Sequence, residues 1–125
     1  MRFKKLEWEE GRDPSPPHRA YTAERTLDAH LTALCADYDR RARVLEEESA
    51  TRRVLMTYKC INCRMLDAAI SVAGSRDGPI FIKEIGNRTG YTSSEIMLSE
   101  SVYKIRKLEV KLAILRKLGL LDAPY

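Results

Sequence analysis

Two cysteines separated by two residues are the side chains in this sequence best suited to holding a metal. Cys60 and Cys63 have the CxxC spacing, and Cys35 with His18 or His30 would supply the further ligands of a tetrahedral zinc site. The CxxC lies inside an apolar helical pattern, however, whereas zinc ligands usually come from turns, and a free cysteine behaves as a small buried hydrophobe. We therefore expect reduced thiols, no metal and no other cofactor.

The remaining reactive side chains do not form a recognisable catalytic set. No serine or cysteine lies in a nucleophile motif, and nothing near His18 or His30 in the sequence suggests a triad. Glu46, Glu47 and Glu48 are consecutive, so they point in different directions on a helix, as at a solvated helix end rather than in an acid-base pair. We expect no enzymatic activity.

The composition indicates one folded, soluble domain. The 125 residues are 44% hydrophobic and 32% charged, which is far from the composition of a disordered chain. No run approaches the length of apolar residues that spans a bilayer, and the charged residues 1–10 lack the apolar segment of a signal peptide. We expect a cytoplasmic protein that does not associate with membranes.

Proline density separates an expected tail from an expected helical domain. Residues 1–21 contain Asp13-Pro14-Ser15-Pro16-Pro17 and are predicted to form an extended N-terminal tail, and residues 22–125 a single helical domain. Thr22 is a good N-cap for the first long helix. One apolar stripe at helical spacing follows it: Leu27, Leu31, Leu34, Tyr38 and Leu45. Whether residues 22–73 form one helix or two is left open.

The middle of the chain predicts a buried helix followed by a short one. Residues 52–73 leave few polar positions on any face, which is typical of the buried centre of a small bundle. Gly74 should end this helix, and residues 74–79 have the composition of a loop. Pro79 suits the first position of a helix over about residues 80–89.

The last helix is predicted from its two ends. Thr92-Ser93-Ser94-Glu95 has the spacing of a capping box, so a helix should begin there after a break at Gly90. No helix-breaking residue follows before Leu118. Gly119 then fits a left-handed C-cap, with Leu120 in contact with Leu115.

Residues 82–96 also carry the features of two crossing helices. The requirements are a small residue at the crossing, a glycine in the turn and apolar residues that lock the second helix onto the first. They are met in turn by Gly86, by Gly90, and by Ile85, Tyr91 and Ile96. In this respect the segment resembles the helix-turn-helix family of DNA-binding proteins. Residues 99–108 look like the stretch that closes many small phage and plasmid regulators of this type.

The resemblance implies an all-α fold, a small helical bundle with a helix-turn-helix-like C-terminal unit and a long final helix. It also implies that the second helix of the unit lies in the major groove of duplex DNA. The expected base-edge contacts are Ser93, Ser94, Met97 and Ser101, and the expected phosphate contacts are Asn87, Arg88 and Lys104. Six bases against one acid between Ser101 and Leu118 give a local excess of +5.

The final helix has more apolar surface than one core contact needs. A seam runs through Leu98, Val102, Ile105, Leu112 and Leu115, and a separate ridge through Ile96, Tyr103 and Val110. A homodimer would cover both, so we expect one. The leading hypothesis is a DNA-binding regulator or accessory protein that acts as a helical dimer. The alternative is a helical protein interaction module, a scaffold or an inhibitor of a nucleic-acid-handling complex, with a protein partner and no direct DNA binding.

Overall fold

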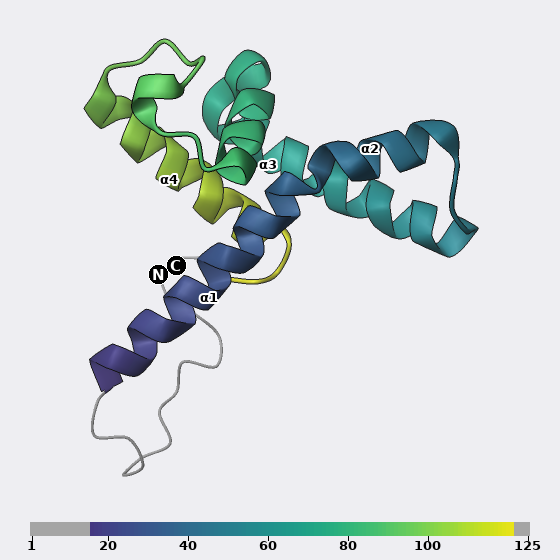
Figure 1. Cartoon of the computed structure of the whole chain (residues 1–125), viewed down its shortest axis with the longest axis horizontal. Helices are drawn as coiled ribbons and strands as arrows, with labels where there is room; N and C mark the ends of the chain where they lie inside the picture. Colours follow the sequence, from purple (N-terminus) through teal and green to yellow (C-terminus); the bar gives the residue numbers. More distant parts are fainter. Residues whose placement is uncertain (1–15, 122–125) are drawn as a thin grey trace.

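The computed structural model describes residues 16–121, and the side chains of residues 25–121 within that range. All regular elements in this range are helical, which confirms the predicted all-α fold (Figure 1). They are α1 (Pro16–Ala36), α2 (Tyr38–Glu47), α3 (Arg52–Asn87), the 3-10 turn η1 (Tyr91–Ser93) and α4 (Glu100–Lys117). None of the described helices combines the length and apolar character needed to cross a bilayer.

α1 begins at Pro16, six residues before the predicted N-cap Thr22. Proline is tolerated in the first turn of a helix because the N–H that it lacks would have no intrahelical partner there. Pro16 and Pro17 therefore start a helix, and the prediction that they belong to an extended tail is wrong. The other residues of the predicted tail, 1–15, lie outside the described residues.

Residues 22–73 contain two helix breaks, so they do not form one continuous helix. A single residue, Asp37, separates α1 from α2, and its N–H still donates to the Ala33 carbonyl at 3.0 Å. α2 ends where Glu48 takes a left-handed conformation with φ of 50°. α3 then starts after Thr51, whose Oγ1 accepts a hydrogen bond from the Val54 N–H at 3.3 Å.

α3 bends at Gly74, where φ of 90° and ψ of 168° leave the helical region. This positive φ favours glycine, and the predicted helix break at Gly74 is confirmed. The predicted loop over residues 74–79 is wrong, because the chain returns to a helix that includes Pro79 and ends at Asn87. A Cβ at Gly78 would lie 2.9 Å from the Ile70 nitrogen, so the two parts of α3 are in close contact at the bend.

The part of α3 that follows α2 is less buried than predicted. α2 and residues 52–64 of α3 project together from the remainder of the molecule, and we call them the arm (Figure 1). Met56 is 64% exposed, and Val54 and Leu55 are half-buried. The prediction of a fully buried central helix is therefore wrong for this part of α3.

A buried arginine lies where the arm joins the other helices. Arg41 is 3% exposed, and its Nε donates to Asn62 Oδ1 at 2.7 Å. One terminal nitrogen donates to the Leu34 carbonyl at 2.7 Å and contacts Met65 Sδ at 3.3 Å. Burial lowers the pKa of Arg41. Its hydrogen bonds link α1, α2 and α3 at one point.

The hydrophobic core lies between α1, α3 from Met65 onward and α4. Its fully buried side chains are Leu31, Met65, Phe81, Ile82, Tyr103, Val110 and Ile114. α1 and α3 approach closely at Gly86, where a Cβ would lie 2.6 Å from the Ala36 nitrogen. Gly86 was predicted to lie where its helix crosses the helix after Gly90, but the backbone that it approaches is that of α1.

The predicted ridge of α4 belongs to this core. Ile96, Tyr103 and Val110 are 5%, 1% and 0% exposed, so the single chain already covers them. The ridge is therefore not a free surface that calls for a dimer.

The C-terminal end of α4 forms as predicted. Gly119 has φ of 76°, and the Leu120 N–H donates to the Leu115 carbonyl at 2.8 Å. This is the Schellman pattern of a left-handed C-cap.

Candidate functional site

The helix expected to begin at Thr92 begins eight residues later. α4 starts at Glu100, after Ser99 as N-cap, and residues 88–99 form a connection that contains only the single turn η1. A helix-turn-helix unit has a connection of three or four residues. The capping-box prediction is wrong, and the Glu95 carboxylate instead lies 4.0 Å from Lys83 Nζ.

The connection is held by Glu84, a carboxylate of α3 that is only 4% exposed. Its Oε1 accepts hydrogen bonds from Ser94 Oγ and Tyr103 OH, both at 2.8 Å. Its Oε2 accepts the Glu95 N–H at 2.8 Å, and Ser94 Oγ accepts the Ile96 N–H at 2.9 Å. Glu84 thus accepts the Ser94 hydroxyl and the Glu95 N–H, which lie in the segment where the capping box was predicted. Because these donors already have an acceptor on α3, no helix cap forms there.

Tyr103 and Lys107 attach α4 to the same connection. Burial, followed by the hydrogen bond to Glu84, raises the pKa of Tyr103 to about 12. Lys107 Nζ donates to the Thr89 carbonyl at 2.7 Å, and burial lowers its pKa. The role of Glu84 was missed from the sequence. The sequence signal that could have indicated a buried Glu84 is its position three residues after Phe81 and next to Ile85, on the apolar side of α3.

The residues predicted to contact DNA do not lie on one helix. Asn87 and Arg88 are at the end of α3, Ser93 is in η1, Ser94 and Met97 are in the connection, and Ser101 and Lys104 are in α4. All are exposed except Ser94, which is half-buried and donates to Glu84. The structure therefore does not bring the predicted base-reading residues together on one recognition helix.

The basic run of α4 is largely paired within the chain. Its ion pairs are Lys104 with Glu100 at 2.9 Å, Arg106 with Glu109 at 3.2 Å, and Lys111 with Asp28 of α1 at 3.2 Å. Lys107 is also engaged, with the Thr89 carbonyl. α4 therefore presents much less free positive charge than its composition indicates.

Among its polar side chains, α4 also exposes three large apolar ones. Val102, Ile105 and Leu108 are 39%, 59% and 54% exposed, and Leu112 on the same side is half-buried. We call these four residues the α4 face. The predicted seam is thus partly a free surface, although Leu115 at its end is buried in the core.

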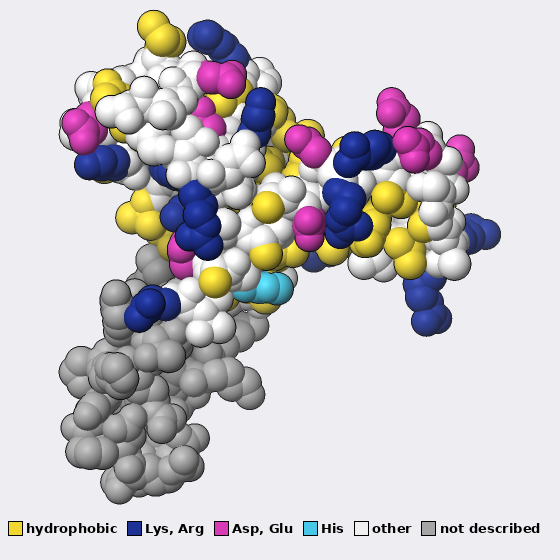
Figure 2. All heavy atoms as spheres, in the orientation of Figure 1, with side chains coloured by type: hydrophobic (Ala, Val, Ile, Leu, Met, Phe, Trp, Pro, Cys, Tyr) yellow, Lys and Arg dark blue, Asp and Glu magenta, His cyan; other side chains and the backbone are white. Residues whose placement is uncertain are grey.

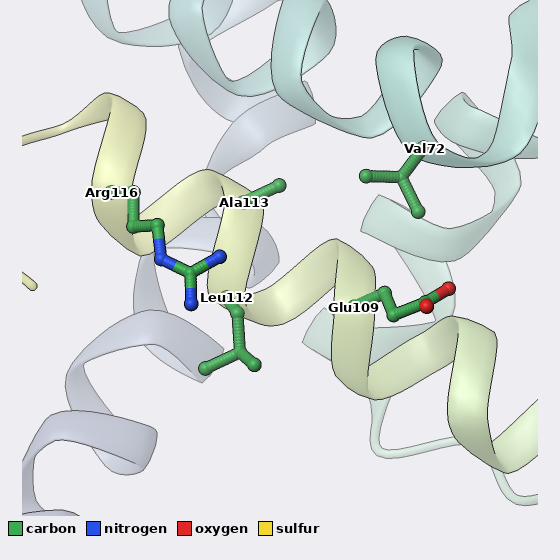
Figure 3. A pocket seen from close by; sticks show the side chains of 5 residues that line it. All are labelled: Val72, Glu109, Leu112, Ala113 and Arg116. Atoms are coloured by element: carbon green, nitrogen blue, oxygen red, sulfur yellow. The ribbon is translucent and has the colours of Figure 1, made fainter. Parts of the chain in front are cut away.

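A shallow open hollow continues the α4 face between α4 and α3 (Figure 3). Figure 3 shows Val72 of α3 opposite Ala113, with Leu112 and the charged ends of Glu109 and Arg116 along α4. Within the described part of the chain, Arg116 Nε is buried without a hydrogen-bond partner. The hollow thus has apolar walls and two charged residues at its rim.

The arm carries the other exposed surface of note. Figure 2 shows Lys and Arg side chains beside hydrophobic ones on this projecting part of the molecule. Its α3 half exposes four bases that form no ion pair among the described residues: Arg52, Arg53, Lys59 and Arg64.

The two thiols of the CxxC, Cys60 and Cys63, are exposed on the arm. No third metal-ligating side chain joins them within the described range. Cys35 is buried in the core, and burial raises its pKa to about 12. The structure therefore does not bring Cys35, Cys60, Cys63 and His30 together, and the side chain of His18 lies outside the described ones.

The described residues thus offer two surfaces for non-covalent contacts, one apolar and one basic. No protein-family model matches the chain, and no curated protein or solved structure matches it either.

Proposed function

We propose that this chain is a helical protein interaction module whose binding surface is the α4 face. The observation that carries the proposal is the exposure of Val102, Ile105 and Leu108 on one regular helix, whose Tyr103, Val110 and Ile114 are already buried in the core. Apolar side chains three and four residues apart on a helix form the surface that a partner helix or groove covers. Burying them yields about 25 cal/mol for each Å² of apolar surface removed from water.

The charges around the α4 face support a protein partner over DNA at this position. Glu100 and Glu109 lie on α4 and would meet a polyanion, and the nearby bases already pair with them. Met97, which is 83% exposed in the connection before α4, adds a flexible apolar side chain of a kind common at protein interfaces.

The test is capture of partners from the source cell by the tagged full-length chain, quantified against two variants. The double variant Ile105→Ser/Leu108→Ser removes the apolar surface, and Met56→Ser makes the same kind of change at an exposed residue of the arm. Proteins retained by wild type and Met56→Ser but lost by the double variant would support the proposal. Equal recovery by all three chains would contradict it.

Duplex DNA binding is a second candidate, and the unpaired bases of the arm favour it. An α-helix fits the major groove of B-DNA, and Arg52, Arg53, Lys59 and Arg64 would neutralise phosphates there. In this role the chain would be a DNA-binding regulator or accessory protein.

A mobility shift on random duplex DNA across a salt series tests this second candidate. Replacing Arg52 and Lys59 by Ala should flatten the salt dependence by about one unit per lost phosphate contact, whereas Lys104→Ala should change it less, because Lys104 is paired with Glu100. Absence of retention at low salt would rule the candidate out.

A further inference from the structure

We infer that the partner of the α4 face is a second copy of this chain, packed with its α4 parallel to the first. The inference rests on the proposed function, because it names the occupant of the same surface. It does not use the ridge of Ile96, Tyr103 and Val110, which the core of the single chain covers.

The spacing of the exposed residues is the first argument. Ile105 and Leu112 are seven residues apart and take heptad position a, while Ser101 and Leu108 are also seven apart and take position d. These residues lie on the side of α4 that faces away from the core or at its edge. Ile105 at a and Leu108 at d match the preference of parallel two-stranded coiled coils for a β-branched residue at a and leucine at d, whereas Leu112 at a and Ser101 at d do not.

Charge complementarity is the second argument. In this register Lys104 takes position g and Glu109 position e of the next heptad, and these positions meet between the two strands of a parallel pair. Lys104 of one copy would therefore lie beside Glu109 of the other, and the two-fold axis would create this pair twice. Both side chains are more than half exposed. In the dimer this pair would replace the pairs that each side chain forms along α4, Lys104 with Glu100 and Glu109 with Arg106.

The next pair of the same kind would bring two cations together, Lys111 and Arg116. Lys111 is bound to Asp28 of α1 at 3.2 Å, so its charge is compensated within each copy. The contact is therefore centred on Ile105 and Leu108, in the first half of α4.

The interface is small, so the dimer should be weak. It uses about two heptads of one helix, whereas stable interfaces usually bury roughly 800 Å² on each partner. We expect a dissociation constant in roughly the micromolar range.

Analytical ultracentrifugation of the full chain over a range from submicromolar to several hundred micromolar tests the inference. Wild type should change from monomer to dimer, and Ile105→Ser should remain monomeric. Lys104→Glu and Glu109→Lys should each weaken the dimer by roughly tenfold, and the double variant should restore it, because each reversal turns two attractions into repulsions. Lys117→Glu, a charge reversal at an exposed position outside the register, is the matched control.

Circular dichroism and melting of every variant establish that the chains remain folded, since each changed side chain is exposed. A wild type that stays monomeric throughout would overturn the second-copy inference but not the proposed function, which the capture experiment decides separately. The parallel α4 pairing would be overturned if Ile105→Ser dimerised as strongly as wild type. It would also be overturned if the double charge reversal failed to restore the dimer.

Discussion

Replacing Glu84 by Ala should cost this chain about 3 kcal/mol of its free energy of unfolding. The substitution removes the acceptor of three hydrogen bonds of 2.8 Å, from Ser94 Oγ, Tyr103 OH and the Glu95 N–H. A hydrogen bond to a charged group contributes about 1.5–3 kcal/mol. The sum is reduced because the variant no longer buries a charge, and because water can reach part of the space that the side chain leaves.

Two further variants separate this network from a general effect of losing a glutamate. Tyr103→Phe removes one of the three hydrogen bonds and should cost about 1 kcal/mol. Glu109→Ala removes an exposed carboxylate that pairs with Arg106 at 3.2 Å, and it should stay within about 0.5 kcal/mol of wild type.

Urea unfolding followed by circular dichroism measures all three free energies, and hydrogen exchange reports on residues 88–99. In Glu84→Ala the amides of this connection should exchange faster than in wild type, because the Glu95 N–H has lost its acceptor. If Glu84→Ala is no less stable than Glu109→Ala, Glu84 does not hold the connection and the reasoning fails.

Three other predictions follow from the core. Gly86→Ala should destabilise the chain by about 3 kcal/mol or more, because the new Cβ would lie 2.6 Å from the backbone of α1. Gly90→Ala is the control and should be nearly neutral, because its Cβ would have no atom within 4 Å. Thermal melting of both variants measures the difference. Cys35 should resist a thiol reagent at pH 8 until the protein unfolds, whereas the two exposed cysteines, Cys60 and Cys63, should react in the native state. Titration with the reagent, with and without denaturant, measures the number of reactive thiols. Three reactive thiols in the native protein would contradict the prediction. The pKa of Tyr103 is raised from 10.0 to about 12, so its contribution to stability is complete below pH 10 and is lost as the pH rises toward 12. Urea unfolding at several alkaline pH values should therefore show a shallower loss of stability in Tyr103→Phe than in wild type, and equal slopes would contradict the assignment.

Helical periodicity and local end signals predicted much of the fold. Gly119 and Leu120 ended α4 as expected because a left-handed C-cap depends only on residues within one turn. Thr92 failed as a helix start because Glu84, on another helix, binds the donors of this segment. A capping pattern covers only four consecutive residues, so it cannot predict a contact between residues ten or more positions apart.

The candidate surface was only partly predictable for a similar reason. Val102 and Tyr103 are neighbours on α4, and each belongs to an apolar stripe with helical spacing. Periodicity shows that two stripes exist, but the packing of α3 decides which of them is covered. Phe81 stacks on Tyr103 with ring centroids 5.6 Å apart, and Val102 remains 39% exposed.

The arm has a consequence for how this molecule opens. Its residues are contiguous in sequence, and one side of its α3 half has no cover, so its backbone hydrogen bonds are protected by little apolar packing. Regions of this kind unfold locally at a lower free energy than the whole domain. The arm would behave as a separate cooperative unit, closed by the hydrogen bonds of Arg41 to Asn62 and to the Leu34 carbonyl. The amides of the arm would then exchange through local unfolding of the arm, whereas the amides around Phe81 and Ile114 would exchange only through global unfolding.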